Sequence, residues 1–109
     1  MAELNGPARE QALFSALLFS LHAAGMQQLG KIMNPMSGKV ERDLEQAQAT
    51  IDMMETIKKR TAGNLDEYET KLLGRLLAEL QMNYVDEVNR EQKPGTPDDG
   101  SGKTILGSN

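Results

Sequence analysis

The sequence predicts an all-α fold in which one helix packs against an antiparallel hairpin of two others, followed by a disordered C-terminal tail. Apolar residues recur at helical spacing in three segments of the 109-residue chain. Only a short connection, Gly63-Asn64-Leu65, separates the second and third segments. A connection that short places its two helices side by side and antiparallel. We therefore expect residues 7–91 to form a single helical domain.

The first helix is expected to run from Pro7 to about Met33. Proline is favourable at a first helical position, and Asn34-Pro35 would end the helix because a residue before proline disfavours helical geometry. At about 100° per residue, one side of this helix collects enough apolar side chains to cover the hairpin. This predicted core side comprises Phe14, Leu17, Leu18, Leu21, Gly25, Leu29 and Ile32.

The opposite side of the first helix is also apolar, and we interpret it as a self-association surface. A helix that is apolar all round is normally buried all round, and two other helices cannot surround it. High helix propensity explains alanines on a solvated face, but it does not explain a phenylalanine or a methionine there. A second copy of the chain, or another protein, would supply the cover. The predicted surface comprises Ala12, Ala16, Phe19, Ala23 and Met26.

The second helix is expected to begin after Asp43 as its N-cap, with Gln46 completing a capping box. It should end at Gly63, which is placed for the left-handed C′ position that glycine favours. Its predicted apolar face comprises Leu44, Ala47, Ile51 and Met54.

The third helix is expected to open with Asp66 and to continue to about Glu91. Glu69 follows Asp66 by three residues, which is a capping-box pattern. We interpret Gly63, Asn64, Asp66 and Glu69 as structural residues of the helix junction, since the Asn64 side chain can bond free backbone groups at either helix end. The predicted seam comprises Leu73, Leu76, Leu80 and Tyr84, with Leu72 and Leu77 beside it.

Residues 92–109 are predicted to be a flexible tail. Their glycine, proline, aspartate and serine residues cannot bury enough apolar surface to order the segment. Two interpretations remain open for Lys103 to Leu106: a short docking segment, or part of a solubilising end. The composition favours the solubilising end.

Charge and composition exclude several classes of protein. The chain has 12 basic and 16 acidic residues and a net charge of −4, which argues against nucleic-acid binding. The apolar stretch from Ala12 to Met26 is shorter than the roughly 20 residues that cross a bilayer. No positively charged segment precedes it, as would be typical of a secretory signal. We therefore expect a cytoplasmic protein. The chain has no cysteine, so it forms no disulfides.

No motif predicts a catalytic, cofactor or metal site, so we expect no enzyme activity. Gly102-Lys103-Thr104 is similar to the end of a phosphate-binding loop, but Pro97 stands where the first glycine belongs and no predicted strand precedes it. His22 is the only histidine and lies at the margin of the core side, where a half-buried structural role fits. Ser15 lies two helical turns from His22 and lacks a glycine-flanked nucleophile turn.

A set of short segments carries a family resemblance over about residues 14 to 88. The segments are Phe14-Ser15-Ala16-Leu17-Leu18, Leu29-Gly30, Ile51-Asp52-Met53-Met54-Glu55, Thr61-Ala62-Gly63-Asn64-Leu65 with Glu69, Leu72-Leu73, Leu77-Ala78-Glu79-Leu80 and Tyr84-Val85. In these segments the chain resembles the bacterial domain of unknown function family 1844. The resemblance implies a small, helical, cytoplasmic bacterial protein, and it implies no activity, substrate or cofactor.

The sequence therefore favours a non-enzymatic helical module that self-associates, as a homo-oligomer, or binds an unidentified protein partner. The alternative is a membrane-surface protein that uses the apolar side of the first helix. Helices of that kind usually carry lysine or arginine on their polar face. Arg9 and Lys31 are the only basic residues of the predicted helix, which disfavours the membrane alternative.

Overall fold

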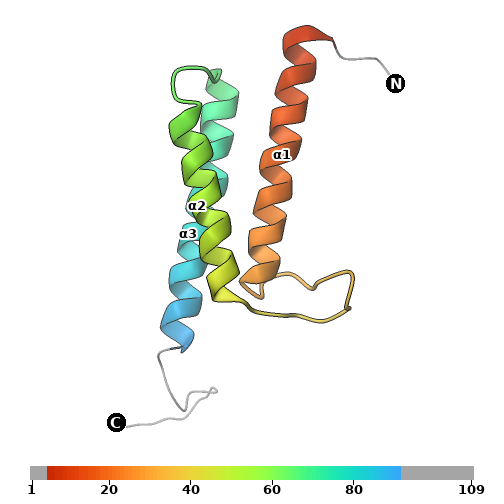
Figure 1. Cartoon of the computed structure of the whole chain (residues 1–109), viewed down its shortest axis with the longest axis vertical. Helices are drawn as coiled ribbons and strands as arrows, with labels where there is room; N and C mark the ends of the chain where they lie inside the picture. The colour runs from red at the N-terminus through yellow and green to blue at the C-terminus, as the bar shows by residue number, and fades with distance from the viewer. Residues whose placement is uncertain (1–4, 92–109) are drawn as a thin grey trace.

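In the computed structural model, which describes residues 5–91, the chain forms three α-helices (Figure 1). They are α1 (Gly6–Gln28), α2 (Leu44–Arg60) and α3 (Glu67–Glu91). α2 and α3 form an antiparallel hairpin, and α1 packs against both of them, so the predicted helical fold is confirmed. The predicted tail, residues 92–109, lies outside the described residues.

α1 ends at Gln28, not near Met33 as predicted. Gly30 adopts a left-handed φ of 77°. Its N–H donates to the carbonyl of Gln27, and the N–H of Lys31 donates to the carbonyl of Met26, both at 2.9 Å. This is a Schellman motif, in which a C′ glycine lets the chain turn back and satisfy the last helical carbonyls. The prediction was wrong because it relied on the downstream proline and passed over this glycine.

Residues 29–43 form a loop that folds back on itself between α1 and α2. The loop contains two isolated antiparallel bridges, Leu29 with Arg42 and Asn34 with Lys39. At its end, the N–H of Asp43 donates to the carbonyl of Gln28 at 2.7 Å. The end of α1 and the start of α2 are therefore joined directly by a backbone hydrogen bond.

Asp43 is the N-cap of α2, as predicted. Its Oδ1 accepts a hydrogen bond from the N–H of Gln46 at 3.1 Å. The other half of the predicted capping box is not formed, because the N–H of Asp43 is engaged by Gln28. α2 ends at Arg60 with Thr61 as C-cap, and Gly63 has a φ of 85°. The predicted left-handed glycine is confirmed, but it lies one residue beyond the C′ position.

α3 begins behind a complete capping box, as predicted. Oδ1 of Asp66 accepts from the N–H of Glu69 at 2.7 Å, and Oε1 of Glu69 accepts from the N–H of Asp66 at 3.0 Å. Both backbone donors lie near the N-terminus of the helix, where no helical carbonyl is available to them. The boundary between α2 and α3 is thus defined by local hydrogen bonds that the sequence pattern identifies.

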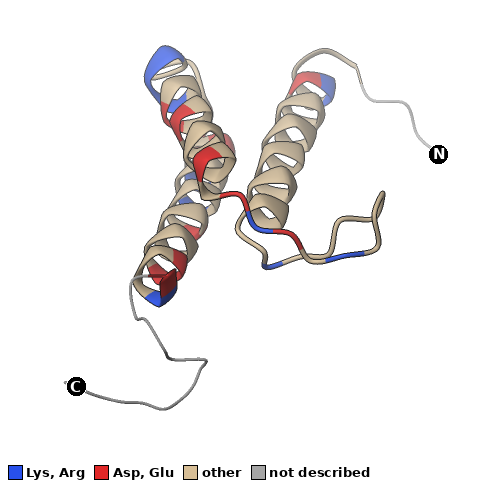
Figure 2. Cartoon of the chain, turned by 60° about the horizontal axis from the view of Figure 1, so that its bottom comes forward, with Lys and Arg blue, Asp and Glu red and all other residues tan. Residues whose placement is uncertain are grey.

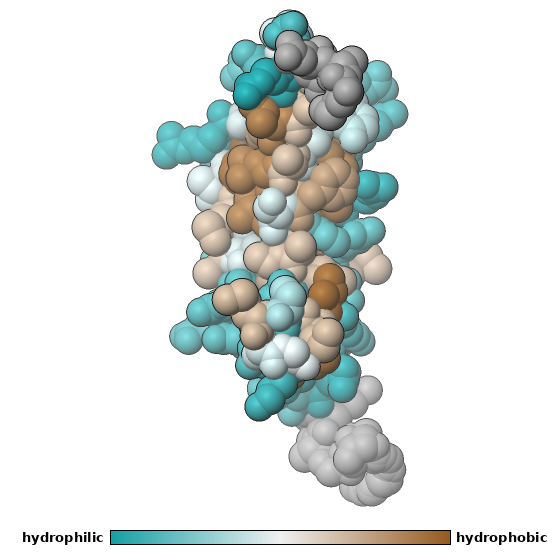
Figure 3. All heavy atoms as spheres, turned by 90° about the vertical axis from the view of Figure 1, so that its right-hand side faces the viewer, coloured by the Kyte–Doolittle hydropathy of each residue, from teal (hydrophilic) through white to brown (hydrophobic). Residues whose placement is uncertain are grey.

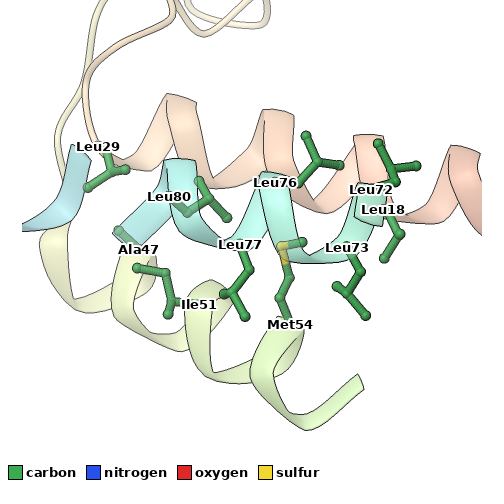
Figure 4. Close-up of a cluster of buried hydrophobic side chains, with 10 residues drawn as sticks. All are labelled: Leu18, Leu29, Ala47, Ile51, Met54, Leu72, Leu73, Leu76, Leu77 and Leu80. Atoms are coloured by element: carbon green, nitrogen blue, oxygen red, sulfur yellow. The ribbon is translucent and has the colours of Figure 1, made fainter. Parts of the chain in front are cut away.

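The hydrophobic core lies where α1 and α2 both pack against the leucine stripe of α3 (Figure 4). The predicted seam of α3 is confirmed, but two residues of the predicted core side of α1 are not in the core. Leu17 and Ile32 are 47% and 43% exposed. Leu17 points about 100° away from Leu18, beyond the arc that two neighbours cover, and Ile32 follows the end of the helix. The buried core comprises Leu18, Leu29, Ala47, Ile51, Met54, Leu72, Leu73, Leu76, Leu77 and Leu80.

Gly25 allows α1 to approach the hairpin closely. A Cβ atom at this position would lie 2.6 Å from Cδ2 of Leu80 and 3.4 Å from Cγ2 of Thr50. Leu80 is 0% exposed, so its side chain can shift only within the packed core. The absence of a side chain at Gly25 therefore determines how tightly α1 packs against α2 and α3.

We expect Gly25→Ala to destabilise the protein by about 1–3 kcal/mol, because overpacking the contact with Leu80 outweighs the helix propensity of alanine. The matched control is Gly74→Ala in α3, where a Cβ would meet nothing within 4 Å. Gly74→Ala should stabilise by about 0.5–1 kcal/mol. Urea unfolding followed by circular dichroism measures both. If Gly25→Ala were as stabilising as Gly74→Ala, the close approach would be wrong.

Candidate interaction surface

The side of α1 that faces away from α2 and α3 is exposed and largely apolar. We call it the outer face of α1. Leu13 is 53% exposed, Leu17 47% and Phe19 46%. Figure 3, which views this side of the molecule, shows apolar side chains gathered along it. The outer face comprises Ala12, Leu13, Ala16, Leu17, Phe19, Ser20 and Ala23, all of which are exposed.

Charged residues are confined to the ends of this face. Between Glu10 and Lys31 the sequence contains no aspartate, glutamate, lysine or arginine. Figure 2 shows the consequence, since α1 carries charged residues only in its first turns while α2 and α3 carry them along their length. Most surface helices of soluble proteins direct charged residues toward solvent, so this face is unusual.

Four of the five residues predicted for self-association, Ala12, Ala16, Phe19 and Ala23, lie on the outer face and are exposed. The fifth, Met26, is half-buried and packs against the core cluster. Met26 therefore belongs more to the contact with the hairpin than to the outer face. The sequence pattern missed Leu13 and assigned Leu17 to the core side, and both add large apolar side chains to this surface beside Phe19.

A polar groove adjoins the outer face at the C-terminal end of α1. It lies between α1, the loop and the start of α2, and has a volume of about 570 Å³. Two carboxylates, Glu41 and Asp43, line it and supply its charge. Glu41 Oε1 accepts a hydrogen bond from Nδ2 of Asn34 at 3.2 Å. The remaining lining residues are neutral: Ser20, Ala23, Ala24, Gln27, Gln28, Asn34 and Gln46.

A buried glutamate on α3 fastens the loop to the hairpin. Glu87 is only 2% exposed. Its Oε2 lies 2.7 Å from Nζ of Lys31 and 2.9 Å from NH1 of Arg90, and its Oε1 accepts from NH1 of Arg42 at 2.9 Å. Lys31 and Arg42 stand near opposite ends of the loop, so a single carboxylate holds both ends. A buried charge is tolerated only when it is paired in this way.

The three cations keep Glu87 ionised. Burial raises the pKa of Glu87, but hydrogen bonds from Lys31 and Arg42 and the charges of Lys31 and Arg90 outweigh burial, so its pKa lies below the ordinary value. Hydrogen bonds to Glu87 and Asp86 raise the pKa of Lys31. Glu87 was not predicted as a structural residue, although Glu87 continues the stripe of Leu80 and Tyr84 at helical spacing.

The predicted junction residues act locally, and one of them also reaches α1. Oδ2 of Asp66 accepts a hydrogen bond from Nε2 of Gln11 at 2.7 Å, which ties the start of α1 to the start of α3. The hydrogen bonds from the N–H of Glu69 and from Gln11 lower the pKa of Asp66. Asn64 is exposed, and its backbone N–H donates to the carbonyl of Thr61 at 2.9 Å. The bond predicted from the Asn64 side chain to a helix end is not formed within residues 5–91.

His22, which the sequence offered as a candidate for chemistry, has a structural partner. His22 is half-buried, as expected, and its Nε2 lies 2.8 Å from Oε1 of Glu79 across the contact between α1 and α3. Within residues 5–91, no group of three or more histidine, aspartate or glutamate side chains is arranged to hold a metal ion. None of the helices in that range has the length and apolar character needed to cross a membrane.

Comparison with known proteins identifies a family. The family model described as Domain of unknown function (DUF1844) matches residues 11–86, which is well over half of the chain. Searches of curated proteins and of solved structures give no match to the chain.

We expect Glu87→Gln to destabilise the protein by about 1–3 kcal/mol at pH 7, because glutamine cannot balance the charges of Lys31 and Arg42. The pKa of Glu87 is lowered in the folded state from an ordinary value of 4.5. The stabilisation that ionised Glu87 gives is therefore complete above pH 4.5 and is lost as the pH falls through the pKa of Glu87 in the folded protein. The stability difference between the wild type and the variant should shrink accordingly.

Urea unfolding between about pH 7 and pH 3 measures this difference. Glu67→Gln is the control, since Glu67 forms an exposed pair with Lys71 and its loss should change stability by only about 0.3 kcal/mol. A stability difference for Glu87→Gln that did not depend on pH would contradict an ionised Glu87 in the folded protein.

Proposed function

The chain belongs to the family Domain of unknown function (DUF1844), and we propose that it is a non-enzymatic helical module that self-associates through the outer face of α1. The observation that carries this proposal is the exposure of an uncharged, largely apolar helix face with Leu13, Leu17 and Phe19 about half exposed. Contiguous apolar surface of this kind marks interaction sites on soluble proteins.

The arrangement of the helices supports the choice of α1. Apart from the buried Glu87 and the half-buried Glu69, the charged residues of α2 and α3 are exposed, and the apolar stripes of both helices face the core. α3 has one smaller apolar patch, where Met82 and Val85 are 72% and 56% exposed. That patch covers about one helical turn and is bordered by the charged Asp86, whereas the outer face of α1 extends over several turns without a charge.

The pairing of polar side chains supports a non-enzymatic role. His22 pairs with Glu79, Asp66 caps α3, and Glu87 joins the loop to the hairpin. These groups hold helices together, which leaves them poorly placed for proton transfer to a substrate. The family resemblance supports the further proposal that the protein is bacterial and cytoplasmic.

We expect the wild-type chain to be a dimer at about 50 μM, and Ala16→Glu and Phe19→Glu to make it monomeric. Each substitution would bury an unpaired carboxylate in the interface, at a cost of about 2 kcal/mol or more. Size-exclusion chromatography with light scattering measures the mass. The control is Ala78→Glu, which makes the same change at an exposed position of α3 and should leave the mass of the dimer unchanged.

A monomeric wild type at this concentration would refute self-association. Flotation with anionic lipid vesicles tests the membrane alternative, for which the wild type would float and Phe19→Glu would not. Binding to vesicles by a monomeric wild type would replace self-association with that alternative.

A further inference from the structure

The outer face of α1 carries a leucine, Leu13, near its N-terminal end and an alanine, Ala23, near its C-terminal end. Leu17 and Phe19 lie in its middle. Two identical chains form a closed dimer by pairing one surface with its own copy. If the two helices run antiparallel about a point near Leu18, Leu13 of each chain faces the small residues of the other. A parallel pair would instead place leucine against leucine and leave gaps between the alanines.

The same pairing brings opposite charges together. Arg9 and Gln27 are 18 residues apart, which is about five helical turns, so both point in the same direction at a separation of about 27 Å. Arg9 is exposed at the N-terminal end of the face, and Gln27 lines the polar groove at the other end. In the antiparallel pair, Arg9 of each chain therefore lies opposite the groove of the other chain, which contains Glu41 and Asp43.

The groove suits a guanidinium group. Arginine has five N–H donors in a planar fork and no acceptor. The carboxylates of Glu41 and Asp43 and the side-chain amide of Gln27 line the groove and can accept from such donors. The side-chain carbonyl of Asn34 already accepts from the N–H of Met36 at 2.8 Å. Its volume of about 570 Å³ leaves room for an arginine side chain.

Size also favours contacts beyond the apolar strip. A helix face about 27 Å long and about 10 Å wide projects only about 270 Å², whereas stable interfaces bury about 800 Å² on each partner. Contacts at both ends would enlarge the interface and fix its register, since opposite charges determine orientation as well as attraction.

We propose that the groove formed by the end of α1, the loop and the start of α2 receives Arg9 of a second copy of the chain, so that two chains pair antiparallel along α1. Each chain completes the groove of the other. This inference rests on the self-association proposed above and adds the direction, the register and the residue that the second copy contributes.

Charge reversal tests the proposal. We expect Arg9→Glu and Glu41→Arg each to weaken dimerisation by on the order of tenfold or more at low salt, because each places like charges in both grooves. Mixing the two variants should restore the dimer, since each groove of the mixed pair then holds one positive and one negative side chain at positions 9 and 41. Sedimentation equilibrium at about 50 mM salt, where charge effects are least screened, measures the three samples.

The control is Arg75→Glu, which makes the same charge change at an exposed position of α3 and should leave the dissociation constant unchanged. Thermal unfolding by circular dichroism confirms that each variant is folded. A dimeric wild type whose affinity is unaffected by Arg9→Glu and Glu41→Arg would overturn the groove contact while self-association stands. Weakened variants that fail to associate when mixed would also overturn it. A monomeric wild type would refute both proposals.

Discussion

The leucine stripe of α3 is the feature on which the architecture depends, because it is too wide for one helix to cover. Its five leucines, all at most 5% exposed, span an arc of about 140° at about 100° per residue. α2 covers one flank and α1 covers the other. Burying a leucine stabilises by roughly 1.5–3 kcal/mol, so removing either covering helix would expose much of the core. α1 is held against the stripe where Gly25 meets Leu80.

The outer face of α1 follows from the same geometry. A helix with two neighbours is covered over only part of its circumference, and α1 has apolar residues beyond that part. Leu17 illustrates this, since it adjoins Leu18 in the sequence yet is about half exposed while Leu18 is fully buried. In the described part of the chain, this face is thus exposed because α1 has only two neighbouring helices. A second copy of the chain would give α1 a further neighbour.

Polar contacts at the two ends of α1 complement the apolar contact in its middle. At the start of α1, Gln11 donates to Asp66, and after its end Lys31 pairs with Glu87. Glu87 also binds Arg42, so the loop between α1 and α2 is held at both ends. Such pairs are directional, whereas apolar packing is not. The position of the loop matters because it forms one wall of the polar groove beside the outer face.

The sequence by itself determined the local features of the fold: three helices, the N-cap Asp43, the capping box of Asp66 and Glu69, and the left-handed Gly63. These depend on residues a few positions apart. Ala12, Ala16, Phe19 and Ala23 were also identified as one surface, because helical periodicity alone places them on one side.

Only the tertiary structure decided the rest. Met26 proved half-buried against the core, Leu17 proved exposed, and Glu87 proved to be buried among three cations. The groove combines residues from α1, the loop and α2 that no spacing rule connects. The physical reason is that burial and ion pairing depend on which distant residues a side chain meets, and a periodic pattern along one helix does not contain that information.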